Sequence, residues 1–216
     1  MTIRDITIPM QDSLACWPGD APFRFTWTSR KRDGATVNVG QFQLSVHTGT
    51  HTDAPFQFDD AGATSDAVDL HPFIGPAQVI VLTDRVRLRR EDLTPFDLSG
   101  TPRVLLRTDG WTDHIQFSTT IPVLDEDDPA WLHQQGVVLV GVDVPSVDDL
   151  DSKTLPNHHA LGAHGITILE SLDLADVPGG LYELLALPMR LVAADGAPVR
   201  AILRDWVGRG ISLHDA

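Results

Sequence analysis

The sequence predicts an α/β protein in the broad sense, rich in strands, with short helices between them and without the regular alternation of a doubly wound sheet. Apolar segments of strand length recur along the whole chain, and residues 137–144 have the continuous apolar character of a strand covered on both faces. Helix signals are few and short. At 216 residues, 42% of them hydrophobic, and with no recognisable linker, we expect one domain, 1–216.

The expected strands follow from alternating or continuous apolar character. They cover residues 3–8, 23–27, 37–46, 77–83, 103–108, 137–144, 166–170, 181–191 and 197–205. Within residues 37–46 the apolar phase shifts by one residue at Gly40–Gln41, which predicts a β-bulge. The turn Ala194-Asp195-Gly196 is expected to join the last two strands, and residues 208–216 to be loosely held.

Two helices are predicted between these strands. Asp127, Asp128 and Pro129 have the acid and the proline that favour a helix start, and this helix is expected to run to about Gln135. A shorter helix is expected over residues 158–164, ended by Gly165.

The formal net charge of −14 argues against nucleic acid and anionic membranes as partners and is compatible with cations and a small-molecule substrate. The acidic runs 125–128 and 148–151 are expected to be solvated loops or helix starts, without a function. The single cysteine, Cys16, excludes an internal disulfide and fits a reducing compartment. With no signal-peptide layout and no segment of transmembrane length, we expect a cytoplasmic protein.

The residues most suggestive of chemistry are His47, His51 and Asp53, which lie within seven positions. Imidazole nitrogen and carboxylate oxygen suit zinc and its neighbours in the first transition row. A glycine and three β-branched threonines in this segment disfavour a helix. We therefore expect a strand ending near Val46, followed by a tight loop that folds the three side chains inward. The alternative is a pair of surface or core histidines with no ligand.

Three protein ligands make an open metal site, and a second ion would need further ligands. The candidates are His158 and His159, near the start of the short helix, and Glu170, at the end of the strand that follows. A short helix and the next strand lie side by side, so their ends can converge. Chemistry alone leaves open whether these residues share the site or are simply exposed.

Several motifs now point to a family. The segment HTGTHTDAP resembles the signature H-x-G-T-H-x-D-x-P of the metal-dependent cyclase-like hydrolases. Together with WPGD and SKTL, it makes the chain similar to the bacterial kynurenine formamidases (arylformamidases) within that family. The similarity covers nearly the whole chain, in the segments 17–20, 37–40, 47–55, 102–108, 152–160, 168–170, 182–188 and 197–203.

The resemblance implies hydrolysis of N-formyl-L-kynurenine to L-kynurenine and formate, a step of tryptophan degradation. It implies two divalent ions, zinc or alternatively Mn²⁺. His47, His51 and Asp53 match the ligands of one ion, and Asp53 would bridge to a second ion held by His158 and Glu170. Trp17 matches a residue of the substrate pocket; the alternative is a turn residue that covers the core. The implied fold is a β-rich, barrel-like core with peripheral helices, of the swivelling β/β/α type, assembled as a homodimer or larger homo-oligomer.

One position departs from the family pattern. The second residue after the motif proline is a proton-shuttling histidine in the family, and here it is Gln57. Glutamine forms hydrogen bonds but cannot exchange a proton near neutral pH. The enzyme is then slow, or another group (His159, or Asp53 through a metal-bound water) substitutes, or the substrate differs, as in an isatin-type lactam hydrolase. A metal-binding homologue without catalysis is the remaining alternative.

Overall fold

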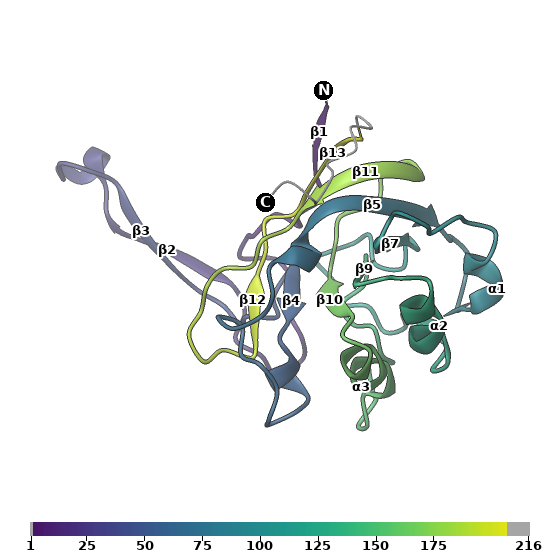
Figure 1. The fold of residues 1–216 in the computed structure, drawn as a ribbon. Helices are drawn as coiled ribbons and strands as arrows, with labels where there is room; N and C mark the ends of the chain where they lie inside the picture. Colours follow the sequence, from purple (N-terminus) through teal and green to yellow (C-terminus); the bar gives the residue numbers. More distant parts are fainter. Residues whose placement is uncertain (1, 207–216) are drawn as a thin grey trace, which may run out of the picture.

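Nine strands form one sheet that curls into half a barrel (Figure 1). The computed structural model describes residues 2–206. The strand order in the sheet is β1-β13-β11-β5-β7-β9-β10-β4-β12, and two-stranded sheets β2-β3 and β6-β8 lie beside it. The fold class predicted from the sequence, a strand-rich α+β protein with a barrel-like core and short helices, is confirmed.

The bounds of the strands are β1 Ile3–Asp5, β2 Arg24–Ser29, β3 Val39–Gln43, β4 His51–Asp53, β5 Ile74–Val81, β6 Arg87–Leu88, β7 Arg103–Arg107, β8 Val123–Leu124, β9 Leu139–Val142, β10 Thr167–Glu170, β11 Gly180–Leu185, β12 Gly196–Pro198 and β13 Ile202–Asp205. The α-helices are α1 Arg90–Leu93, α2 Asp128–Gln134 and α3 Pro156–Ala163, and the 3-10 helices are η1 Lys31–Asp33, η2 Pro55–Gln57 and η3 His71–Phe73.

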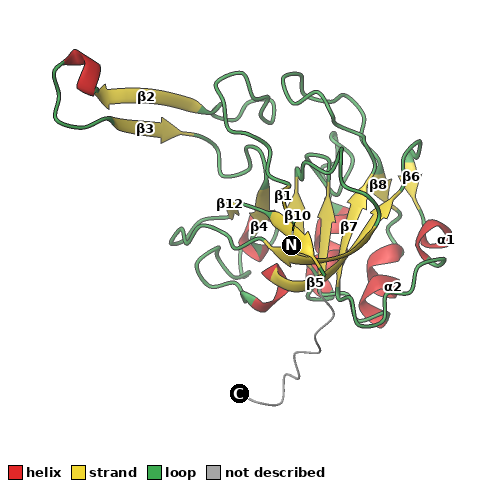
Figure 2. Cartoon of the chain, turned by 90° about the horizontal axis from the view of Figure 1, so that it is seen from above, coloured by secondary structure: helices red, strands yellow, loops and turns green. Residues whose placement is uncertain are grey.

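The middle of the sheet is parallel, because β5, β7, β9 and β10 pair in the same direction, and its flanks are antiparallel. Side chains of the central strands alternate between two apolar cores. Val104 and Leu106 of β7 face one core, whereas Leu105 faces the other. The first core is covered by α1, α2 and α3, which contribute Leu93, Leu132 and Leu161 among others (Figures 1 and 2). This explains why the central strands read as continuous apolar runs.

The predicted strand 197–205 is divided in the structure. Residues 196–198 form β12 at one edge of the sheet, whereas residues 202–205 form β13 near the opposite edge. Only residues 199–201 separate them, so the curl brings the two ends of the sheet close together. Apolar character continues through the crossing because Val199 and Ala201 are buried between the edges.

Three further expectations differ from the structure. The strand expected over residues 77–83 begins earlier, at Ile74, so Gly75 and Pro76 lie inside β5. The register irregularity of the β2-β3 pair lies between Trp27 and Ser29, on the strand opposite the predicted bulge. The expected strand 37–46 ends at Gln43, and residues 44–50 form the turn towards β4. The tail 208–216 lies outside the described residues.

The strands β2 and β3 form a hairpin that extends away from the curled sheet as an arm (Figures 1 and 2). Within residues 2–206 no helix is long and apolar enough to cross a bilayer.

Candidate metal centre

Strand β4 places His51 and Asp53 in the sheet, and this corrects the loop expected from the sequence. The turn comes earlier, at Gly49, whose φ of 69° is the left-handed conformation that glycine adopts without strain. The three residues of β4 pair with β10 on one side and with β12 on the other. Alternation along the strand then points His51 and Asp53 to one face and Thr52 to the other.

The pairing of β4 with β10 brings the second half of the site into place. Glu170 lies directly opposite His51 in the antiparallel register, so both side chains point to the same face of the sheet. Helix α3 covers this face and presents His158 from its first turn. Leu155 before α3 and Ser171 after β10 both have positive φ, a backbone strain that is common around functional sites.

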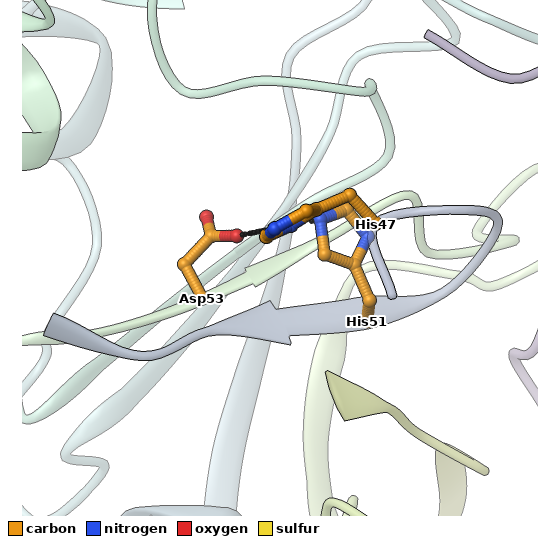
Figure 3. Close-up of side chains that lie close together, drawn as sticks. All are labelled: His47, His51 and Asp53. Carbon is orange, nitrogen blue, oxygen red and sulfur yellow. Dashed lines mark ion pairs between the residues drawn. The ribbon is translucent and has the colours of Figure 1, made fainter. Parts of the chain in front are cut away.

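His47 reaches the same point from the turn before β4, and Figure 3 shows its ring meeting the Asp53 carboxylate beside His51. The approach depends on Gly196 in β12. A Cβ atom at this position would lie 2.8 Å from Cε1 of His47 and 2.9 Å from the Thr52 carbonyl oxygen. Glycine is therefore the residue that lets the imidazole pack against the sheet edge.

The five side chains form two groups that share Asp53, namely His47, His51 and Asp53, and Asp53, His158 and Glu170. Oδ1 of Asp53 lies 3.0 Å from Nδ1 of His47 and 3.4 Å from Nε2 of His51. Oδ2 of Asp53 lies 3.4 Å from Nε2 of His158. Zinc bonds of about 2.0–2.1 Å in tetrahedral geometry separate neighbouring ligand atoms by roughly 3.3 Å, so these distances fit a metal ion.

Each histidine of the site uses its other ring nitrogen in a bond that fixes its tautomer. Nδ1 of His158 donates to Oδ2 of Asp148 at 2.6 Å, and Nδ1 of His51 donates to the Gly49 carbonyl at 2.8 Å. Nε2 of His47 donates to Oδ2 of Asp195 at 2.9 Å. The remaining nitrogen of each ring therefore points towards Asp53, the position that a metal ligand needs.

The carboxylates of the centre are buried and accept few hydrogen bonds. Both oxygens of Asp53 are buried and accept no hydrogen bond from any residue in the range 2–206. Glu170 is also buried, and within the described part of the chain only its Oε1 accepts a hydrogen bond, from the Val147 N–H at 2.8 Å. Two adjacent buried acids are costly unless cations offset their charge. Divalent ions coordinated by these residues would satisfy them.

The pKa values follow from this concentration of charge. Burial lowers the pKa of His51, but the carboxylates of Asp53 and Glu170 outweigh it and raise the pKa to about 10. For His158 burial is likewise outweighed, chiefly by Asp148 and Asp53, and the pKa is again raised to about 10. Burial and the charge of Asp53 raise the pKa of Glu170. The site thus attracts positive charge, and bound metal would compete with protons for it.

A cavity of about 290 Å³ opens above the centre, and its floor includes His47, His51, His158 and Glu170. Its aromatic wall contains Trp17, Trp111 and Phe117, with the Trp17 and Phe117 rings packed edge to face at 5.4 Å between centroids. Gln57, Asp20 and Asp195 also line it. Trp17 and Gln57 thus both line the cavity above the candidate centre.

The structure does not bring His159 to the cavity. Its side chain is exposed and packs against the ring of Phe58, because a residue next to His158 on a helix points about 100° away. Sequence reasoning missed Trp111, Phe117, Asp148 and Asp195. Asp148 was expected to be a solvated acid, yet it is buried and binds His158. No local pattern could have identified these residues, because they belong to loops distant from the motif.

The curled sheet thus carries a buried centre of histidines and carboxylates under an aromatic cavity. Comparison with known proteins shows the family to which such a chain belongs. The chain belongs to the Cyclase family, described as "Putative cyclase", whose profile matches residues 4–149. A kynurenine formamidase from Geobacillus thermodenitrificans is 47% identical over 200 residues, which cover 93% of this chain and 96% of that protein.

Solved structures show the same fold. One described as a potential metal-dependent hydrolase with cyclase activity is 27% identical, with a TM-score of 0.82 over 96% of this chain and 99% of that chain. An isatin hydrolase bound to the product analogue thioisatinate has a TM-score of 0.81 at 20% identity, over 93% of this chain and 91% of that chain. The latter likeness extends to the fold alone.

Proposed function

We propose that this protein hydrolyses N-formyl-L-kynurenine to L-kynurenine and formate. The observation that carries the proposal is the pair of metal-binding groups that share Asp53 beneath an aromatic cavity. The high identity to kynurenine formamidases over 93% of the chain supports this substrate. The chain 1–216 is proposed to act as one domain and to assemble as a homodimer.

The centre is proposed to hold two divalent ions, most simply Zn²⁺, with Mn²⁺ as the alternative. His47, His51 and Asp53 would hold one ion, and Asp53, His158 and Glu170 the other. When bound, such ions act as Lewis acids: they lower the pKa of water to about 7 and polarise a carbonyl group. The mixed nitrogen and oxygen donor set is one that zinc accepts.

The cavity walls suit an aromatic amino acid. Trp17, Trp111 and Phe117 offer ring faces and edges for the anthraniloyl ring, and such aromatic contacts contribute about 0.5–1.5 kcal/mol beyond area burial. The Asp20 and Asp195 carboxylates line the same cavity and could accept hydrogen bonds from the α-ammonium group of the substrate. This arrangement would place the formamide group over the buried acids.

Gln57 limits what the cavity can do to the leaving amine. Its Nε2 lies 3.5 Å from Nδ1 of His47, and its Oε1 is buried with no hydrogen-bond partner among residues 2–206. The side chain can take part in hydrogen bonds, but it cannot deliver a proton. The leaving aniline would then take its proton from water, which slows its release.

The experiment is an assay of the purified, metal-loaded protein with N-formylkynurenine, in which formation of kynurenine is followed by absorbance. We expect hydrolysis that disappears when a chelator removes the metal and returns when zinc is added back. A protein that binds metal but does not hydrolyse N-formylkynurenine would contradict the proposal.

A second candidate is a lactam hydrolase that opens an isatin-like ring, and Gln57 is the observation that favours it, because it departs from the formamidase pattern. A substrate panel separates the two functions. Faster turnover of cyclic amides than of formyl-anilides would favour the lactam hydrolase. Hydrolysis of neither class by metal-loaded protein would leave a metal-binding protein without catalysis.

A further inference from the structure

The cavity above the centre is lined by acids and, among residues 2–206, by no basic side chain. Asp20 and Asp195 belong to its wall and Glu170 to its floor, and the lining includes neither a lysine nor an arginine. The whole chain is acidic as well, with a formal net charge of −14. An anionic group of a ligand would therefore meet carboxylates at the wall, without the guanidinium or ammonium group that commonly binds such an anion.

The N-terminus of helix α3 lies beside the cavity, but its backbone donors are already used. Free N–H groups at a helix N-terminus are a second way to bind a carboxylate. Here the first residue, Pro156, has no N–H, and the N–H groups of Asn157 and His158 donate to the two oxygens of Asp148 at 2.8 and 3.1 Å. This helix therefore offers nothing to the carboxylate of a ligand.

The two wall acids are oriented and keep acceptor capacity for a ligand. Oδ2 of Asp20 accepts the Ser45 hydroxyl at 2.7 Å, and Oδ2 of Asp195 accepts Nε2 of His47 at 2.9 Å. Within the described chain, Oδ1 of each accepts no hydrogen bond. Trp17 lies in the same turn as Asp20, whose backbone N–H donates to the Trp17 carbonyl at 3.0 Å. Carboxylate oxygens and the face of an indole ring both attract an ammonium group.

We propose that the cavity selects ligands by positive charge and hydrolyses N-formylated aryl ketone amines without an α-carboxylate, such as N-formylkynuramine, in preference to N-formylkynurenine. The inference rests on the proposed function, which places the formamide group over the centre and the other end of the ligand at the wall. The amine keeps the ammonium group that the wall acids accept and lacks the carboxylate that they repel. The bond changes are the same for both substrates: the oxygen of water joins the formyl carbon, the C–N bond breaks, and the free aniline, formate and a proton are released.

The test is a series of three product-like ligands that share one aryl ketone and differ in charge. Kynuramine carries an ammonium group, kynurenine an ammonium group and a carboxylate, and deaminated kynurenine a carboxylate alone. Quenching of tryptophan fluorescence in the zinc-loaded, full-length protein gives their dissociation constants. We expect kynuramine to bind at least about 10-fold tighter than kynurenine, and deaminated kynurenine at least about 10-fold weaker, with smaller ratios at high salt. Equal constants for all three ligands, or tightest binding of the deaminated acid, would overturn the inference.

The variant Asp20→Asn assigns the selection to the cavity wall. It removes one charge and keeps an oxygen that accepts the Ser45 hydroxyl, and it should lower the preference for kynuramine over the deaminated acid at least about 10-fold. The matched control is Asp60→Asn, because Asp60 is exposed and does not line the cavity. The control should leave the preference within about twofold, since exposed charges contribute little. An unchanged preference in Asp20→Asn, or an equal change in both folded variants, would overturn the assignment.

Steady-state kinetics separate this inference from the proposed function. We expect kcat/KM for N-formylkynuramine to exceed that for N-formylkynurenine at least about 10-fold. A lower value for the amine, with N-formylkynurenine still hydrolysed, would overturn the inference and leave the proposed function standing. Hydrolysis of neither compound would overturn the proposed function, and the binding series would still decide whether the cavity selects positive charge.

Discussion

Replacing Asp148 by asparagine should weaken metal binding while the fold persists. Oδ2 of Asp148 accepts hydrogen bonds from Nδ1 of His158 at 2.6 Å and from the His158 backbone N–H at 3.1 Å. Oδ1 accepts the Asn157 backbone N–H at 2.8 Å. Every partner is a donor, so an amide NH₂ in place of either oxygen would face a donor. The ring of His158 would then lose its fixed orientation.

The expected loss can be worked from this geometry. The bond from His158 to Asp148 is short, buried and charge-assisted, and Asp148 is only 1% exposed. Removing such an orienting carboxylate from a metal-binding histidine typically lowers metal affinity about 10–100-fold. This corresponds to about 1.4–2.8 kcal/mol of binding free energy. The loss of affinity should appear for the more weakly bound of the two ions, or for both.

The assay is a competition titration against a coloured chelator, which gives the zinc dissociation constants. Asp149→Asn is the matched control, because Asp149 follows in the chain but is exposed and pairs with Arg87 at 2.6 Å. An unchanged affinity in Asp148→Asn would refute the reasoning. An equal loss of zinc affinity in both variants would show that the loss comes from removing a negative charge near the site rather than from a change in the orientation of His158.

Three further predictions follow from the site and the core. Gln57→His should raise kcat for N-formylkynurenine at least about 10-fold if a missing proton donor limits turnover, whereas Gln57→Leu should not; equal rates for both would exclude the idea. Trp17→Ala should raise KM about 5-fold or more and leave zinc content unchanged, as steady-state kinetics and metal analysis will show. Burial, and after it the charge of Asp125, raises the pKa of Asp128 to about 6. The folded state therefore favours the protonated carboxyl group, and the stability that this group contributes is present at low pH and lost as the pH rises through 6. Asp128→Asn should therefore raise the free energy of unfolding by about 1 kcal/mol at pH 7.5 and much less at pH 4, measured by urea denaturation; a destabilised variant at pH 7.5 would contradict this.

The sequence predicted those parts of the site that local pattern encodes. His47, His51 and Asp53 stand in one short motif, and the helix and strand that carry His158 and Glu170 have clear apolar signals. Their convergence depends on the register of β4 against β10, which pairs residues more than 100 positions apart. The single sequence contains no information on that register beyond the resemblance to known hydrolases.

The elements that the sequence misplaced are those that tertiary context decides. Strand β4 has only three residues, all with polar side chains, and its composition does not predict a strand. Its pairing with β10 and β12 decides its conformation instead. The chain crosses between the sheet edges at residues 199–201, where Val199 and Ala201 are buried and Arg200 is exposed, so the alternation expected of one strand continues through the crossing. The acidic runs are a further example. Their composition predicts solvated side chains, yet Asp128 and Asp148 are buried by the residues that pack around them.

The central claim is that one buried carboxylate, Asp53, joins two metal-binding groups. The most direct test is metal analysis by mass spectrometry of protein loaded with zinc and freed of excess. We predict two equivalents of metal per chain for the wild type and loss of both in Asp53→Ala. A wild-type protein that retains no tightly bound divalent ion, or an Asp53→Ala variant that keeps both, would contradict the account.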